Sequence, residues 1–95
     1  MTRRPDPARQ LLRALRRSAE AAGCAPELRH EALTPWASAT FSGGRHQVLA
    51  IGAGLAAWLD ALPHTELATV GWFVADLAVE RGEAGALLTA LVLEG

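Results

Sequence analysis

The fold is decided by residues 36–59, which read WASATFSGGRHQVLAIGAGLAAWL. Small, polar and apolar residues alternate on both sides of the Gly43-Gly44 pair. Two adjacent glycines accept the positive φ angles of a two-residue turn, so this pattern predicts a β-hairpin of 36–42 with 45–51.

Two helices are predicted on either side of this hairpin. The Gly-rich residues that follow it lead into a short helix over 54–62, which is apolar nearly all round. Upstream, leucines and alanines at helical spacing predict an amphipathic helix over 8–22, with Asp6 as its N-cap and Gly23 as the residue that stops it. Residues 1–7 contain two prolines and are expected to form a flexible lead-in.

The remaining strands complete a single domain over residues 1–95. A second hairpin is predicted for 71–81 with 86–94, joined through 82–85, and a further edge strand is optional over 26–34. The order is therefore α-(β)-ββ-α-ββ. It predicts an α+β fold: a two-layer sandwich with a mostly antiparallel sheet of four or five strands and two helices on one face.

The sheet face away from the helices should be polar in such a fold, but here it is half apolar. The apolar residues that we expect on this outer face are Trp36, Leu49, Ile51, Trp72, Val74, Leu91 and Leu93. An apolar patch of this kind marks an interaction surface. Since two-fold homodimers are the commonest oligomers, we expect a second copy of the chain as the partner.

The residues from Gly52 to Ala57 fit the pattern G-x-G-x-x-[G/A] between a strand and a helix. This is the local context of the dinucleotide-binding fingerprint. The preceding strand belongs to a hairpin, however, and too few residues follow to complete a parallel sheet. We interpret Gly52 and Gly54 as a strand-to-helix corner, with anion binding there as a weaker alternative, and we expect no cofactor.

A row of arginines covers one side of the first predicted helix: Arg9, Arg13, Arg16 and Arg17. Such a row can contact the phosphates of a nucleic acid, although it is more often a hydrated helix face. The pI is about 6.3 and no known nucleic-acid motif is present. Nucleic-acid binding through this helix is therefore the alternative hypothesis rather than the first one.

Soft-metal ligands are few and poorly spaced. The four candidates are Cys24, His30, His46 and His64, with Asp60 and Asp76 as possible oxygen donors. None has the spacing of a C-x-x-C or H-x₃-H site, so we predict no metal site. In the predicted hairpin His46 faces Phe41, which favours a packing role for the histidine.

The sequence contains no recognisable set of catalytic residues. Ser38, Ser42 and Cys24 could act as nucleophiles beside His46, but no acid is placed to orient the histidine. Asp76 lies mid-strand, where it is either structural or a catalytic acid, and the sequence leaves both open. We therefore name no catalytic residue and favour a non-enzymatic protein.

The sequence narrows the classes of function that the protein could have, but it does not identify one. A lone cysteine and the lack of a secretory leader predict a cytoplasmic protein, and the use of Arg without any Lys indicates a GC-rich bacterial genome. The longest apolar run is too short to span a membrane. The first hypothesis is a homodimeric interaction module that associates through the sheet face. The second is a nucleic-acid accessory protein, and the third is a small enzyme or an anion or nucleotide binder at the Gly52–Gly54 corner.

Overall fold

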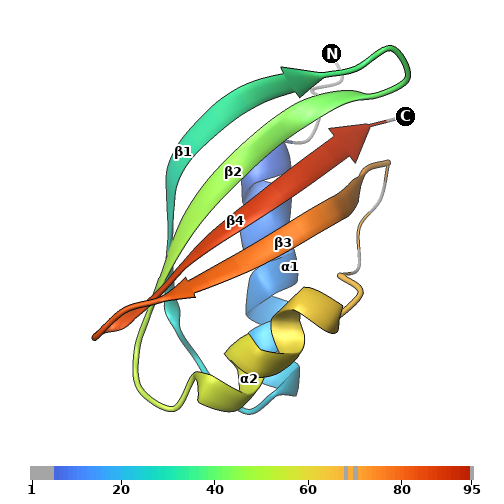
Figure 1. Cartoon of the computed structure of the whole chain (residues 1–95). Helices are drawn as coiled ribbons and strands as arrows, with labels where there is room; N and C mark the ends of the chain where they lie inside the picture. Colours follow the sequence, from blue (N-terminus) through green and yellow to red (C-terminus); the bar gives the residue numbers. More distant parts are fainter. Residues whose placement is uncertain (1–5, 68, 70, 95) are drawn as a thin grey trace.

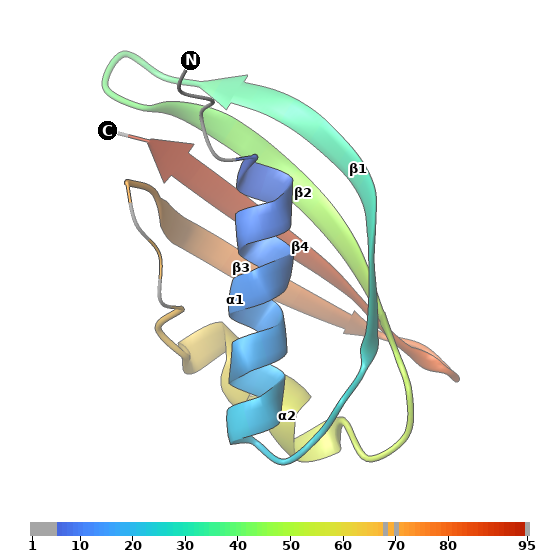
Figure 2. The same ribbon diagram turned by 180° about the vertical axis from the view of Figure 1, so that it is seen from behind.

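The computed structural model describes residues 6–67, 69 and 71–94 and has the predicted α+β architecture. One antiparallel sheet has the strand order β1-β2-β4-β3, and both α-helices cover the same face of it (Figures 1 and 2). In chain order the elements are α1 (Pro7–Ala21), β1 (Glu27–Ala37), β2 (Ser42–Ile51), α2 (Ala56–Ala61), the 3₁₀ helix η1 (Leu62–His64), β3 (Phe73–Arg81) and β4 (Gly85–Glu94).

Helix α1 begins and ends where its sequence signals place it. The Asp6 side chain accepts a hydrogen bond from the Ala8 N–H at 3.0 Å, and Pro7 occupies the first helical position. The helix ends at Ala21, and Gly23 follows with φ 83°. The prediction of a helix over 8–22 is thus confirmed within one residue at each end. Residues 1–5 of the predicted lead-in lie outside the described residues.

The core lies between the helices and the two central strands, β2 and β4. The helix-facing positions of these strands carry small or medium side chains, which lets the helices approach the sheet closely. The buried residues of the core cluster are Leu11, Leu15, Ala19, Leu28, Val48, Ala50, Leu55, Trp58, Leu59, Leu62, Trp72, Ala86, Leu88, Ala90 and Val92.

Two buried indoles connect α1 to the rest of the chain. Trp58 of α2 donates its Nε1–H to Ser18 Oγ at 3.0 Å, and Trp72 donates its Nε1–H to Gln10 Oε1. Because both acceptors lie on α1, these bonds satisfy the polar atoms that the two large side chains bring into the core.

The first hairpin differs from its prediction. The optional edge strand over 26–34 and the first hairpin strand form one continuous strand, β1, that runs through Pro35. Pro35 is tolerated because β1 is an edge strand whose outer side needs no ladder hydrogen bonds. The turn comprises residues 38–41 rather than Gly43-Gly44, so the predicted pairing of Phe41 with His46 is wrong.

A side chain and a close approach explain why the turn lies at 38–41. Ser38 Oγ accepts hydrogen bonds from the N–H groups of Thr40 and Phe41, and its own N–H donates to the Phe41 carbonyl. Gly43 is instead part of β2, where a Cβ atom would collide with the carbonyl of Val92 on β4. The glycine therefore serves the contact between strands rather than a turn.

The second hairpin and α2 also need local corrections. Strand β3 begins at Phe73 rather than at residue 71, and an irregularity between Val74 and Asp76 shifts its register against β4. The shift places Phe73 on the face of the sheet away from the helices. Helix α2 begins at Ala56 instead of residue 54, because Gly52–Gly54 are used by the corner before it.

Replacement of Gly43 by alanine should destabilise the protein far more than the same change at Gly44. The Cβ atom at Gly43 would meet backbone that cannot move, whereas at Gly44 it would meet the end of the Leu33 side chain, which can rotate. We expect Gly43→Ala to lower the free energy of unfolding by about 2 kcal/mol or more and Gly44→Ala by less than about 1 kcal/mol. Urea unfolding of both variants measures the difference, and equal losses would contradict this account.

Candidate functional site

The outer face of the sheet, defined as the face away from α1 and α2, is the largest surface that the fold leaves without a covering layer (Figure 1). Strand alternation and the observed registers place these residues on it: Arg29, Ala32, Thr34 and Trp36 of β1; Arg45, Gln47, Leu49 and Ile51 of β2; Leu87, Thr89, Leu91 and Leu93 of β4; and Phe73, Asp76, Ala78 and Glu80 of β3. Apolar and charged side chains alternate over this surface.

Four of the predicted interface residues lie half-buried on the outer face: Trp36, Leu49, Ile51 and Leu91. Leu93 also lies on this face but is only 5% exposed. The prediction of an outer-face position is wrong for two residues, Trp72 and Val74. Trp72 precedes β3 and is buried in the core, and Val74 packs against the core on the helix side because of the irregularity in β3.

Aromatic side chains gather at one end of the outer face. The rings of Phe41 and Phe73 meet edge to face, with their centroids 5.5 Å apart and an interplanar angle of 81°. Phe73 pairs with Leu93 of β4 across the sheet, yet its own side chain is 42% exposed. An exposed phenylalanine on a sheet face was not among the residues that we predicted at the interface.

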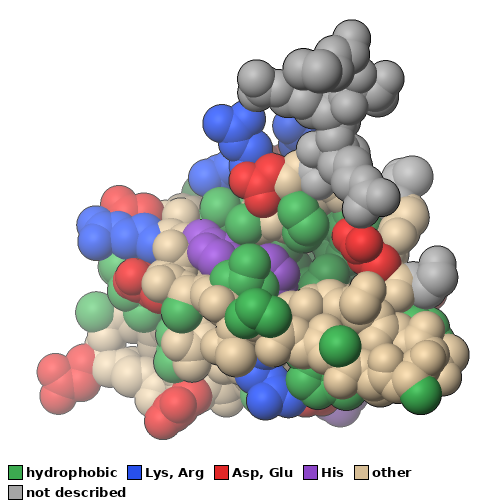
Figure 3. All heavy atoms as spheres, turned by 90° about the horizontal axis from the view of Figure 1, so that it is seen from above, with side chains coloured by type: hydrophobic (Ala, Val, Ile, Leu, Met, Phe, Trp, Pro, Cys, Tyr) green, Lys and Arg blue, Asp and Glu red, His purple; other side chains and the backbone are tan. Residues whose placement is uncertain are grey.

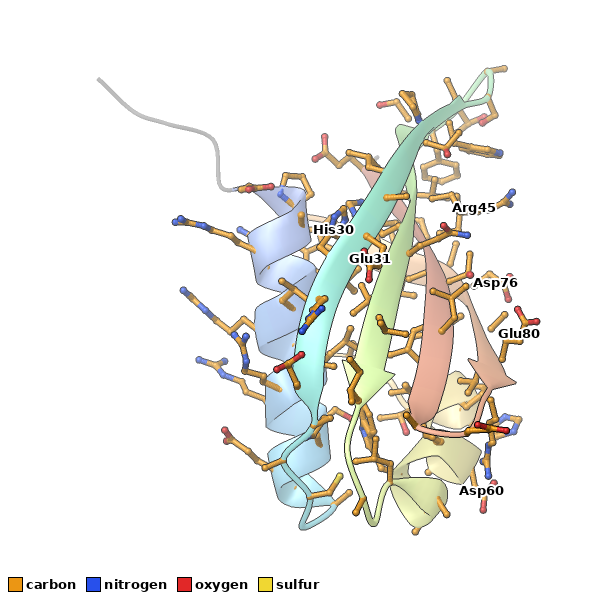
Figure 4. The ribbon with its side chains drawn as sticks, turned by 90° about the vertical axis from the view of Figure 1, so that its left-hand side faces the viewer. His30, Glu31, Arg45, Asp60, Asp76 and Glu80 are labelled. Carbon is orange, nitrogen blue, oxygen red and sulfur yellow. The ribbon has the colours of Figure 1, made fainter. Side chains whose placement is uncertain are left out.

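Charged side chains of both signs flank the central strand β4 on the outer face. Arg45 of β2 and Asp76 of β3 both pair with Leu91, from opposite sides of β4 (Figure 4). The ion pairs among the described residues are Arg29 with Glu27 and Arg81 with Asp60, so neither Arg45 nor Asp76 takes part in one. The arrangement leaves an opposite charge on each side of an apolar strand.

On the helix side, His30 and His46 form a hydrogen-bonded pair. His30 Nε2 and His46 Nδ1 are 2.8 Å apart, and the rings meet at 74°. His46 is only 2% exposed, whereas His30 is half-buried and points between β1 and α1 (Figure 4). In the neutral pair one imidazole must donate its N–H to the other.

His46, but not His30, lines a groove of about 310 Å³ beside the N-terminus of α1. Its lining is mostly apolar, with the carboxylates of Asp6 and Glu94 at the rim, and Figure 3 looks onto this end of the molecule. Burial lowers the pKa of His46 below its usual 6.5, the neighbouring His30 lowers it further, and the Asp6 carboxylate acts in the opposite direction. His46 is therefore a neutral imidazole near pH 7.

The groove does not assemble a nucleophile with a base. Ser42 lies in the same groove as His46, but it is four residues away along β2, which is about 13 Å. Ser38 is engaged in the turn, and Cys24 donates its thiol to the Ala19 carbonyl at 3.5 Å. None of these side chains is placed to transfer a proton directly to His46.

The metal candidates are likewise dispersed. Among residues 6–67, 69 and 71–94, no three His, Cys, Asp or Glu side chains converge on a position that could hold an ion. His30 and His46 adjoin each other, whereas His64 lies exposed in η1. Sequence reasoning missed the histidine pair because it placed His46 opposite Phe41. A hairpin of 27–37 with 42–51 would have brought His30 and His46 together.

The glycine corner and the arginine row occupy separate places. Gly52 and Gly54 have φ angles of 152° and 72° and lie before the six-residue helix α2. Strand β2 is antiparallel to both of its neighbours, so the parallel βαβ unit of a dinucleotide fold does not occur here. Arg9, Arg13, Arg16 and Arg17 are all exposed on α1. Binding of an anion or a nucleic acid at these places remains a prediction.

A scan against protein-family models gives no match, and no significant match is found among curated proteins or solved structures. Within the described residues, no helix combines the length and the apolar character that a membrane crossing needs. The function therefore has to be inferred from the surfaces described above.

The protein should lose stability as the pH falls from 7.5 to 5.5, partly through His46. The unfolded chain binds a proton at this histidine near pH 6.5, whereas the folded chain resists it, so the unfolded state is favoured as the pH drops below that value. In His46→Gln this part of the pH dependence should disappear. Thermal unfolding at both pH values measures it.

The exposed His64 provides the control for this experiment. His64→Gln should keep the pH dependence of the wild type. If His46→Gln and the wild type lost the same stability between the two pH values, the burial of a neutral His46 would be contradicted.

Proposed function

We propose that this protein is a small cytoplasmic binding module that forms a homodimer through the outer face of its sheet. The observation that carries the proposal is the composition of that face. Apolar side chains occur on all four strands, and Phe73 is 42% exposed there, at positions where a sheet in contact with water is normally polar. The cytoplasmic setting is supported by the single thiol, which has no partner cysteine in the chain.

The size of the outer face is compatible with a specific dimer. Four strands of about nine residues present a surface of roughly 19 Å by 30 Å, which is on the order of 600 Å² in each copy. Complete overlap of the two faces would bury about 1,200 Å² in total, which is at the lower end of the range for specific protein–protein interfaces.

The dimer is tested by sedimentation velocity over a range of protein concentrations. We expect the wild type to sediment as a dimer at tens of micromolar, and Phe73→Asp to shift the dissociation constant upward by at least about tenfold because it buries a charge in the apolar interface. A wild-type protein that remains monomeric at the highest concentration would overturn the proposal.

Leu33 provides a matched control, since among the described residues it is the other large hydrophobic side chain that is strongly exposed, at 53%. It lies on the helix side of the sheet, where it lines the groove beside His46. Leu33→Asp should therefore leave the dimer intact. If both variants weakened the dimer equally, a general loss of folding rather than a specific outer-face contact would explain the result.

A second candidate function rests on the exposure of four arginines along α1, none of which takes part in the ion pairs described above. In this case labelled DNA or RNA should bind at low ionic strength and be released as salt is added, because each phosphate contact frees a counterion. Arg13→Gln combined with Arg17→Gln should reduce the affinity. The absence of any salt-sensitive binding would remove this candidate.

A further inference from the structure

The positions of the charged side chains on the outer face indicate how two copies of the chain would pack together. This inference rests on the proposed dimer. Strand β4 runs through the face with Leu87, Thr89 and Leu91 pointing outward. Arg45 on one side of β4 and Asp76 on the other lie level with Leu91. Their backbones are two strand spacings apart, or about 10 Å, and the two side chains do not form an ion pair with each other.

Two simple two-fold axes would place the outer faces of two copies against each other. An axis across the strands, at the level of Thr89, keeps β3 over β3 and brings Asp76 of one copy over Glu80 of the other. Two carboxylates that face each other in an interface repel, which disfavours this arrangement. An axis that runs along β4 avoids this contact, because it exchanges the strands on either side of β4.

We propose that the copies associate about a two-fold axis parallel to β4, so that Arg45 of each copy lies over Asp76 of the other. The axis maps β2 onto β3 at the same level along the strands, and each Arg–Asp contact therefore occurs twice. Strand β4 faces itself, and its leucines form the apolar centre of the interface. Strand β1 of each copy lies outside the overlap of the two faces. Packed sheets cross at an angle of about 30°, which separates the ends of the strands but preserves contacts near the centre, where Arg45 and Asp76 lie.

Charge exchange tests this arrangement by sedimentation equilibrium. Arg45→Asp and Asp76→Arg should each raise the dissociation constant of the dimer by at least about tenfold, because each places like charges opposite one another twice. The double variant should restore it to within about threefold of the wild type. Both residues are exposed, and thermal unfolding of each variant verifies that the monomer is folded.

Glu80→Arg separates the two axes. In the proposed arrangement Glu80 lies over the strand position of Leu49, so the variant should change the dissociation constant little. With the axis across the strands, the variant would place an arginine over Asp76 and tighten the dimer. Tightening by this variant would overturn the proposed axis.

Cross-linking through Thr89 gives an independent measurement. In a Cys24→Ser background, Thr89→Cys places two thiols face to face on the axis, closer together than the spacing of about 10 Å between the packed sheets, so a short bismaleimide should link them. Ala32→Cys on β1 is the control, because its two copies would be about 20 Å apart and should not react together.

The outcomes of these experiments separate a failure of the proposed dimer from a failure of the proposed two-fold arrangement. A monomeric wild type would overturn the proposed dimer itself. A dimer that is insensitive to Arg45→Asp, or that the double variant fails to restore, would leave the proposed function in place and overturn this arrangement. Efficient cross-linking of Ala32→Cys would also overturn it, because Ala32 lies level with Thr89 and only the axis across the strands brings its two copies together.

Discussion

The structure depends on the packing of α1 against the two central strands. A helix of this length is marginal in water by itself, so its stability comes from the face that it buries. Leu11 and Leu15 of α1 are completely buried in one cluster with Ala50 and Ala90 of the sheet. Burial of each leucine contributes about 1.5–3 kcal/mol, and the small alanines opposite permit the short separation between the layers. The hydrogen bond from Trp58 to Ser18 then fixes α2 beside the same helix.

This packing leaves the outer face without cover and isolates the histidine pair on the helix side. All four strands are used by the sheet and both α-helices lie on one face, so none of the described elements covers the other face (Figure 2). His46 is held neutral because the layer that buries the core also buries its imidazole. The uncovered outer face and the histidine pair thus follow from a single arrangement of layers.

Local signals in the sequence were sufficient to predict the element order and α1. The helical spacing of its leucines, the cap at Asp6 and the stop at Gly23 all act within a few residues of one another, so they can be read without tertiary structure. The turn of the first hairpin could not be read in this way. A Gly-Gly pair suits either a tight turn or a close approach of strands, and only the contact of Gly43 with β4 distinguishes them.

The outer-face residues could be predicted wherever side chains alternate regularly between the two faces of the sheet. Leu49, Ile51 and Leu91 were placed correctly on the outer face because their strands follow a strict period of two. The prediction for Val74 was wrong because the irregularity in β3 interrupts that period. No residue type in this segment indicates such an irregularity. The same dependence on register explains the histidines: His30 and His46 become neighbours only when β1 continues through Pro35.

The irregularities in the two edge strands have a consequence for how the molecule avoids aggregation. Strand β1 has a register shift at Glu31 and a proline without an N–H group, and strand β3 has its own shift at Ala75. Both interrupt the regular row of backbone donors and acceptors that another strand would need in order to extend the sheet sideways. Growth into an open-ended cross-β fibril is thereby hindered at both borders. The proposed association through the outer face, in contrast, would close after two molecules, because a two-fold contact uses the same face of both copies.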